Sequence, residues 1–229
     1  MDIVHTITDV KHNPKHVFAT ATASKSYLCF PCESEKGTLA LYDLDTFKEK
    51  LQIPAHNTAI GCLSLNEQAT RVATSSVKGT VIRVFDTTSG DKIHELRRGL
   101  RVAALYSVSL TANGEYLCCT GDSETVHVFK VLTTEQRRKA LEEQGWVSSV
   151  GSLAVQATGL FSSQAERFMQ EERSVCTFPN PYHGLKTFCN IGVVPAKQDC
   201  LRLHLCGVNG FLNTFLLEKK ENEWACELH

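Results

Sequence analysis

Runs in which apolar and small residues alternate with polar ones recur along the chain, a pattern typical of half-buried β-strands. Four of these runs are candidate inner strands: His16 to Ala23, Ala59 to Leu65, Ala104 to Leu110, and Lys186 to Val194. A second run follows each of them: Lys25 to Cys32, Ala69 to Ser76, Gly114 to Gly121, and Leu201 to Val208. The pattern therefore predicts an all-β protein.

A third run in each group carries a repeat of sequence. Gly37 to Asp43 (GTLALYD) returns as Gly79 to Asp86, as Glu124 to Lys130, and more loosely as Gly210 to Phe215. The first three copies are spaced by roughly 40–45 residues, the period of a four-stranded propeller blade. We predict a WD40-type β-propeller with about four blades, near residues 14–57, 58–100, 101–178 and 184–229. Met1 to Ile7 is interpreted as the last strand of an earlier blade, so that N-terminal blades are missing.

The third and fourth copies lie about twice as far apart as the others, which indicates an insertion or a hidden blade. Residues 132–173 show no strand alternation. They contain a charged, helix-like stretch, Thr134 to Glu143, followed by a segment rich in Ser and Gly. We interpret 132–173 as a loop inserted in the third blade, whose outer strand resumes near Ser174 to Phe178. Loops of this length without a fold of their own are usually functional or disordered.

Charge and hydropathy narrow the function classes. The 229 residues carry 24 Lys and Arg against 25 Asp and Glu, a net charge of −1, so bulk attraction to nucleic acid or to a membrane is not expected. Any anion site must therefore be local. No apolar run approaches the ~20 residues that span a bilayer. Met1 to Lys15 is polar and lacks the apolar stretch of a signal peptide.

Ten cysteines without a secretory signal suggest reduced and mostly buried thiols. Several fall in expected strands: Cys62, Cys118, Cys119, Cys189 and Cys206. Cys29 and Cys32 form a CxxC pair with His12 and His16 upstream, but no second CxxC or HxxxH follows to complete a zinc site. Ser, His and Asp residues are scattered, and no Gly-rich phosphate loop opens a helix. We therefore predict a non-catalytic protein without metal or cofactor.

Arg97 and Arg98 stand side by side between two strand-rich repeats. Neighbouring side chains on a strand point to opposite faces, so the two guanidinium groups diverge and suit two separate anion sites. Guanidinium binds phosphate in a planar, bidentate way, and Gly99 allows ligand or backbone to approach closely. The alternative is a solvated sheet edge that happens to carry two arginines.

Leu96-Arg97-Arg98-Gly99, together with Ala73 to Phe85 and Glu124 to Phe129, resembles the PROPPIN family, whose animal members are called WIPI proteins. The hallmark of the family is an Arg-Arg motif written Phe/Leu-Arg-Arg-Gly. The resemblance implies a seven-bladed WD-repeat propeller that binds phosphatidylinositol 3-phosphate and phosphatidylinositol 3,5-bisphosphate in autophagy. It covers essentially the whole chain, which matches the last four blades of that architecture.

The resemblance implies two lipid sites on the propeller rim, one for each arginine. The first would use His56, Thr74, Ser76, Thr80, Arg83 and Arg97. The second would use Arg98, Thr125 and His127, next to Gly99. A hydroxyl expected in the second site falls on Gly121, so the adjacent Thr120 would have to replace it. Bound phosphate would hold His56 and His127 in the charged form, although His56 is alternatively the structural histidine common in WD repeats.

The resemblance also likens the insertion to a loop that reaches into the bilayer. Its apolar residues would enter the membrane interface and supplement weak headgroup binding: Trp146, Val147, Val150, Leu153, Leu160 and Phe161. A partner-binding or packing helix, or disorder, is the alternative.

The expected role is that of a cytoplasmic scaffold, peripheral on phagophore, endoplasmic reticulum or endosomal membranes. Its partners would be the two inositides and the lipid-transfer or conjugation machinery of autophagy, with no nucleic acid. The alternative function is a WD-repeat protein-interaction platform that has lost lipid binding, since missing blades expose sheet edges.

Overall fold

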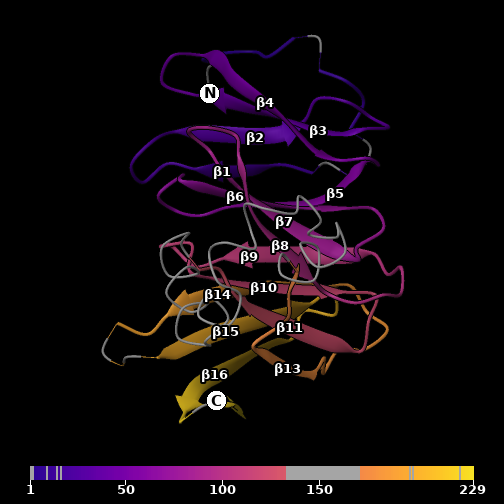
Figure 1. Cartoon of the computed structure of the whole chain (residues 1–229), viewed down its shortest axis with the longest axis vertical. Coiled ribbons are helices and arrows are strands. Elements are labelled where there is room, and N and C mark those ends of the chain that lie inside the picture. Colours follow the sequence, from indigo (N-terminus) through magenta and orange to yellow (C-terminus); the bar gives the residue numbers. More distant parts are fainter. Residues whose placement is uncertain are drawn as a thin grey trace, which may run out of the picture.

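The computed structural model describes residues 3–8, 10–13, 15, 17–132, 171–195, 197, 199–221 and 223–229. In these ranges the chain forms strands and no helix. The strands build four sheets, which follow one another in chain order from the N-terminal to the C-terminal end of the molecule (Figure 1). The all-β propeller class predicted from the sequence is confirmed.

Each sheet is one blade, with its strands in chain order from the inner to the outer edge. Blade I contains β1 (Ala19–Ala21), β2 (Tyr27–Pro31), β3 (Gly37–Asp43) and β4 (Lys48–His56). Blade II contains β5 (Ile60–Leu65), β6 (Arg71–Ser76), β7 (Val81–Asp86) and β8 (Lys92–Arg97), and a fifth strand, β12 (Glu171–Glu172). Blade III contains β9 (Leu105–Leu110), β10 (Tyr116–Gly121), β11 (Thr125–Lys130) and β13 (Cys176–Pro179). Blade IV contains β14 (Thr187–Val193), β15 (Cys200–Gly207), β16 (Leu212–Lys220) and β17 (Glu223–Leu228).

The aspartate that ends two of the sequence repeats closes the turn into the fourth strand of its blade. Asp43 Oδ1 accepts the backbone N–H groups two and three residues ahead at 2.8 and 3.0 Å, and Asp86 Oδ1 accepts the equivalent pair at 2.7 and 3.0 Å. These local hydrogen bonds stabilise a tight turn. The third repeat has Lys130 instead, and its fourth strand, β13, comes only after the insertion.

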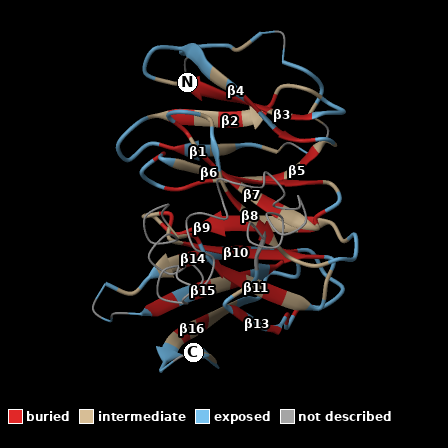
Figure 2. Cartoon of the chain, in the orientation of Figure 1, coloured by how far each residue is buried: buried red, intermediate tan, exposed pale blue. Residues whose placement is uncertain are grey.

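Apolar side chains of facing sheets fill the space between neighbouring blades. Figure 2 colours the buried residues red along the strands. The three clusters contain Leu41 and Val72 between blades I and II, Leu96 and Phe129 between blades II and III, and Val128 and Leu203 between blades III and IV. Truncating one buried Leu to Ala typically costs about 2–5 kcal/mol. The packed blade faces therefore hold rim residues of adjacent blades in fixed relative positions.

All ten cysteines are free thiols, and seven of them are buried, as the sequence predicted. Cys118 and Cys119 are adjacent on β10 and face different inter-blade clusters. Burial raises the pKa of the Cys62 thiol to about 12, with a smaller contribution from Cys189. These thiols act as small apolar core residues.

Two expectations are corrected by the structure. Residues 3–8 form no strand; instead His5 stacks on Phe47 with ring centroids 4.6 Å apart, and its Nε2 lies 2.8 Å from the hydroxyl of Tyr42. A strand needs a neighbour for its backbone groups, whereas here the His5 side chain makes the contact with blade I. The second correction is β12, a strand inside the region expected to have none, which pairs in parallel with β8. The helix-like stretch 134–143 lies outside the described residues.

Candidate functional site

Arg97 is the last residue of β8, and Arg98 continues the pairing with β7. Arg97 lies opposite Val81, and the N–H of Arg98 donates to the carbonyl oxygen of Thr80 at 3.0 Å. Successive residues of a paired strand face opposite sides. Because Leu96 is buried in the cluster with blade III, Arg98 lies on the blade III side and Arg97 on the blade I side. The two guanidinium groups therefore serve different junctions between blades.

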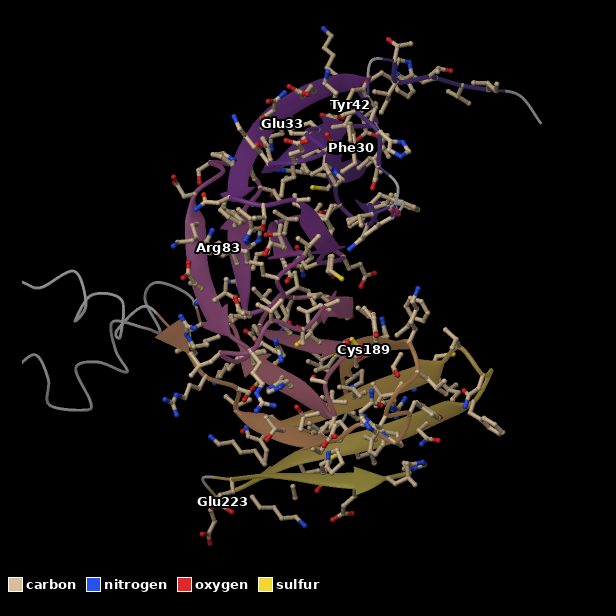
Figure 3. The ribbon with its side chains drawn as sticks, turned by 90° about the vertical axis from the view of Figure 1, so that its right-hand side faces the viewer. Phe30, Glu33, Tyr42, Arg83, Cys189 and Glu223 are labelled. Carbon is tan, nitrogen blue, oxygen red and sulfur yellow. The ribbon has the colours of Figure 1, made fainter. Side chains whose placement is uncertain are left out.

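The first junction brings together His56 at the end of β4, Thr74 in β6 and Arg83 in β7. His56 Nε2 lies 2.8 Å from Thr74 Oγ1, and both side chains are buried. Arg83 Nη1 donates to the carbonyl oxygen of Ala55 at 2.7 Å, which ties blade II to the end of β4. Arg83 lies near the rim of the molecule in Figure 3. The cluster of His56, Thr74 and Arg83 is called the first site below.

Glu95 belongs to the first site, and the sequence analysis missed it. Its Oε2 accepts hydrogen bonds from Arg83 Nε at 2.8 Å and from Lys92 Nζ at 2.9 Å. Despite the cost of partial burial, these two cations lower the pKa of Glu95. Part of the donor capacity of Arg83 is thus used by a protein carboxylate. The signal was present in the sequence: Glu95 stands two residues before Arg97, hence on the same face of the strand.

His56 is neutral at pH 7 in this structure. Burial lowers its pKa to about 4, and the positive charge of Arg83 acts in the same direction. The charged imidazole was expected next to bound phosphate. Without ligand the imidazole is neutral, because the cost of burying its charge exceeds the gain from the hydrogen bond with Thr74.

The second junction, called the second site below, contains Arg98, Thr125 and His127. Thr125 Oγ1 lies 3.0 Å from His127 Nε2, whereas His127 Nδ1 is buried and has no hydrogen-bond partner among the described residues. Burial lowers the pKa of His127 to about 4, and the charge of Arg98 contributes. Arg98 Nε donates to the carbonyl oxygen of Gly79 at 2.8 Å, and its Nη2 donates to that of Arg101 at 2.6 Å.

Thr120 does not belong to the second site, contrary to the sequence-based expectation. Its hydroxyl donates to the carbonyl oxygen of Thr187 in blade IV at 2.5 Å and is buried there. Thr120 and His127 face opposite sides of blade III because Cys119, not Thr120, is the register partner of His127. Gly121 cannot carry the missing hydroxyl either, since a Cβ there would lie 2.4 Å from the carbonyl oxygen of Ala104. The second site therefore has one hydroxyl fewer than expected.

The remaining predicted residues fall around these two junctions or outside the described chain. Ser76 is buried on the same face of β6 as Thr74, and its hydroxyl accepts the N–H of Lys78 at 3.4 Å. Thr80 contributes its carbonyl oxygen to the N–H groups of Arg98 and Gly99. Space is open around Gly99, where an added Cβ would meet nothing within 4 Å. The predicted membrane residues lie outside the described residues: Trp146, Val147, Val150, Leu153, Leu160 and Phe161.

No group of three or more His, Cys, Asp or Glu side chains within the described ranges is arranged to hold a metal ion. Cys29 of the CxxC pair is fully buried in the cluster between blades I and II, and burial raises its pKa. Among the described residues, no helix is long and apolar enough to cross a bilayer.

The lowered pKa values of His56 and His127 predict a stability that falls in acid. A histidine whose folded-state pKa is depressed opposes folding once it is protonated, so stability is fully present above the unfolded pKa near 6.5 and is lost as pH falls towards 4. For His56 the loss is about 3 kcal/mol, at about 1.4 kcal/mol per pKa unit. Urea unfolding between pH 4 and 7 measures how the free energy of unfolding depends on pH. The slope of this dependence should be smaller in the His56→Gln variant. An unchanged slope in this variant would contradict the assignment.

Taken together, these features define four blades of a WD-type β-propeller with two cationic junctions between blades, each pairing an arginine with a histidine and a threonine. A sequence model described as PROPPIN matches residues 1–228. The chain therefore belongs to the PROPPIN family.

Relatives of known sequence and structure agree with this assignment. WD repeat domain phosphoinositide-interacting protein 1 of Xenopus laevis is 31% identical over 224 residues, which is 96% of this chain and 50% of that protein. Autophagy-related protein 18 of Caenorhabditis elegans is 30% identical over 187 residues, covering 79% of this chain and 45% of the relative. The structure of Kluyveromyces lactis Hsv2 with complete loop 6CD superposes with a TM-score of 0.65 at 24% identity, covering 93% of this chain and 60% of the other. The chain spans about half the length of the curated relatives it matches.

Proposed function

We propose that this chain is a non-catalytic reader of membrane phosphoinositides, binding phosphatidylinositol 3-phosphate and phosphatidylinositol 3,5-bisphosphate through Leu96 to Gly99. The observation that carries the proposal is the divergence of Arg97 and Arg98 towards two junctions, each with a histidine–threonine pair. Fixed cationic and hydroxyl donors on both sides of one strand suit two separate phosphate groups. The names of the relatives, phosphoinositide-interacting and autophagy-related proteins, support the same ligand class and process.

Phosphate binding would change the protonation of the two histidines. A phosphate dianion next to a neutral imidazole raises the imidazole pKa, so that binding takes up a proton as the pH falls below neutral. In the second site, the buried Nδ1 of His127 would then gain an acceptor for its proton. The first site should bind more tightly, because Thr74 and Ser76 both lie on its face of β6, whereas the second site lacks a hydroxyl at Gly121.

Membrane attachment would use a second contact, from the apolar residues between Trp146 and Phe161. Stable anchoring generally takes two signals, and a headgroup site alone gives weak, reversible attachment. With both contacts the protein would act as a peripheral scaffold on phagophore, endoplasmic reticulum or endosomal membranes. There it would recruit the lipid-transfer or conjugation proteins of autophagy.

Flotation of the purified 229-residue chain with lipid vesicles tests the proposal. We expect it to float with vesicles containing phosphatidylinositol 3-phosphate or the 3,5-bisphosphate, and not with vesicles containing unphosphorylated phosphatidylinositol. Binding should weaken as salt rises, because the contact is between charged groups. A folded chain that stays at the bottom of the gradient with all vesicles would exclude the proposed function.

A WD-repeat interaction platform without lipid binding is the second candidate. One observation favours it: apolar side chains at the blade IV end of the molecule are exposed, including Phe188 (52%), Leu212 (62%) and Phe211 (66%). Exposed apolar surface of this kind marks interaction sites. A cooperative melt combined with no vesicle binding would favour this candidate over the lipid reader.

A further inference from the structure

The first site holds an anion of its own, the carboxylate of Glu95. One oxygen of this carboxylate, Oε2, lies 2.8 Å from Arg83 Nε and 2.9 Å from Lys92 Nζ. Arg83 stands opposite Glu95 in the pairing of β7 with β8, and Arg97 lies two residues further along the same face of β8. The side chain of Glu95 is 17% exposed, so solvent and salt screen these contacts only in part. A protein carboxylate therefore lies among the cations of the first site.

An irregularity in β8 places Lys92 in this cluster. Residues 92 and 95 are three apart, so in a regular strand their side chains would point to opposite faces. The pairing of β7 with β8 shifts between two neighbouring residues, because Val84 lies opposite His94 whereas Phe85 lies opposite Lys92. The extra residue on β8 is a β-bulge, which turns Lys92 to the face of Phe85, between blades I and II. The bulge thus directs a second cation of blade II towards Glu95.

Both donor edges of the Arg83 guanidinium are engaged in part. A guanidinium can bind a phosphate bidentately through Nε with one terminal nitrogen, or through its two terminal nitrogens. Nε donates to Glu95, and Nη1 donates to the carbonyl oxygen of Ala55 at 2.7 Å. The contact with Ala55 involves the backbone of β4 and is fixed by the fold, whereas the Glu95 side chain can rotate away. Release of Glu95 would therefore give Arg83 a complete edge for a ligand.

We propose that Glu95 is an internal competitor of phosphate in the first site, so that a phosphate monoester displaces its carboxylate and takes over Arg83 and Lys92 as donors. The inference rests on the proposed function, because it concerns the same site. It adds Lys92 to the residues that bind the ligand. A phosphate carries close to two negative charges and three acceptor oxygens, more than the carboxylate that it replaces. An unphosphorylated inositol headgroup brings no charge and leaves Glu95 in place, so the competitor favours phosphorylated ligands.

Replacing Glu95 by glutamine tests the competition. Glutamine has nearly the same shape and can still accept the hydrogen bond of Arg83, but it carries no charge. We expect Glu95→Gln to bind inorganic phosphate about tenfold more tightly than wild type, the effect of removing one charge a few ångströms from a phosphate dianion. Titration followed by the NMR signal of the Arg83 Nε–H group measures this affinity at the first site. The gain should shrink at high salt.

The matched control for charge is Asp91→Asn. Asp91 is exposed and directly precedes Lys92, so the variant removes the same charge from the same turn without touching the Arg83 contact. We expect its affinity for inorganic phosphate to be close to that of wild type. A gain as large as that of Glu95→Gln would show that the effect comes from net charge alone and would overturn the competition.

The role of Lys92 is tested in the Glu95→Gln background. In wild type, Lys92→Met removes a donor for the ligand and also a cation that holds the competitor, so the two effects oppose each other. Without the competitor only the first effect remains, and Lys92→Met should lower phosphate affinity about tenfold. Methionine keeps an unbranched apolar side chain, so the packing of the Lys92 stem is largely preserved. No loss of affinity in this double variant would overturn the assignment of Lys92.

Vesicle flotation separates this inference from the proposed function. We expect Glu95→Gln to float with phosphatidylinositol 3-phosphate vesicles at lower lipid concentration than wild type, and a thermal melt checks that both proteins are folded. A gain in phosphate affinity without vesicle binding by either protein would support the competition and exclude the lipid reader. Phosphate affinity that is unchanged, lower or absent in Glu95→Gln would overturn the competition, and would show that Glu95 only positions Arg83.

Discussion

The double variant Arg97→Ala with Arg98→Ala is expected to lose binding to vesicles containing phosphatidylinositol 3-phosphate. A hydrogen bond to a charged group is worth about 1.5–3 kcal/mol, so the two changes remove about 3–6 kcal/mol, or roughly 10²–10⁴-fold in affinity. Because the arginines serve different junctions, each single variant should weaken binding by less. Arg97→Ala should have the larger effect, since the second site lacks a hydroxyl at Gly121. Vesicle flotation over a range of lipid concentrations measures these differences.

Arg101→Ala is the matched control for charge. Its side chain is exposed in the same loop, and only its carbonyl oxygen takes part in the contact with Arg98. We expect nearly wild-type binding from this variant. Since Arg98 also donates to the carbonyl oxygen of Gly79, a thermal melt must show that the double variant remains folded. A folded double variant that still floats with the vesicles would show that the arginines do not bind the lipid.

Gly79→Ala is expected to cause a large loss of stability. Gly79 has φ of +62°, and a Cβ there would lie 2.0 Å from the carbonyl oxygen of Ala103, a backbone atom that cannot rotate away. Left-handed strain of about 1–2 kcal/mol and overpacking of about 1–3 kcal/mol add to about 2–5 kcal/mol. The melting temperature should fall by about 5–15 °C. Binding through the second site should also weaken, because Gly79 accepts the hydrogen bond of Arg98.

The variant Gly90→Ala separates backbone strain from overpacking as causes of the loss of stability. Gly90 also has a positive φ, +80°, but an added Cβ would lie 3.6 Å from Leu51 Cδ1 and 3.7 Å from Ile53 Cγ1, which is ordinary contact. We expect about 1–2 kcal/mol from backbone strain alone. Equal losses in the two variants would contradict the role assigned to the contact between the Gly79 turn and Ala103.

Much of the fold could be predicted because its signals are local. Alternation of apolar and polar residues and the repeat that begins at Gly37 predicted the groups of strands, and the propeller class is confirmed. Asp43 and Asp86 close turns with backbone groups two and three residues away, so a short window of sequence contains the whole interaction. The divergence of Arg97 and Arg98 follows in the same way from the two-residue period of a strand.

The surroundings of the two sites could not be predicted from the sequence, because they depend on contacts between residues far apart in the chain. Burial at the junctions makes His56 and His127 neutral, and Glu95 takes part of the donor capacity of Arg83. The Thr120 hydroxyl donates to the carbonyl oxygen of Thr187 in blade IV, which lies more than 60 residues further along the chain. No short-range pattern contains this information.

By itself, the sequence determined the first three strands of each blade, the repeat of the blades and the opposite directions of the two arginines, since backbone geometry sets these patterns within short stretches of chain. Only the tertiary structure decided which groups surround each arginine, which protonation state the histidines take, and that β12 joins blade II instead of blade III. Those outcomes depend on the packing of one blade against the next, because this packing decides which side chains are removed from water and which hydrogen-bond partners lie within reach.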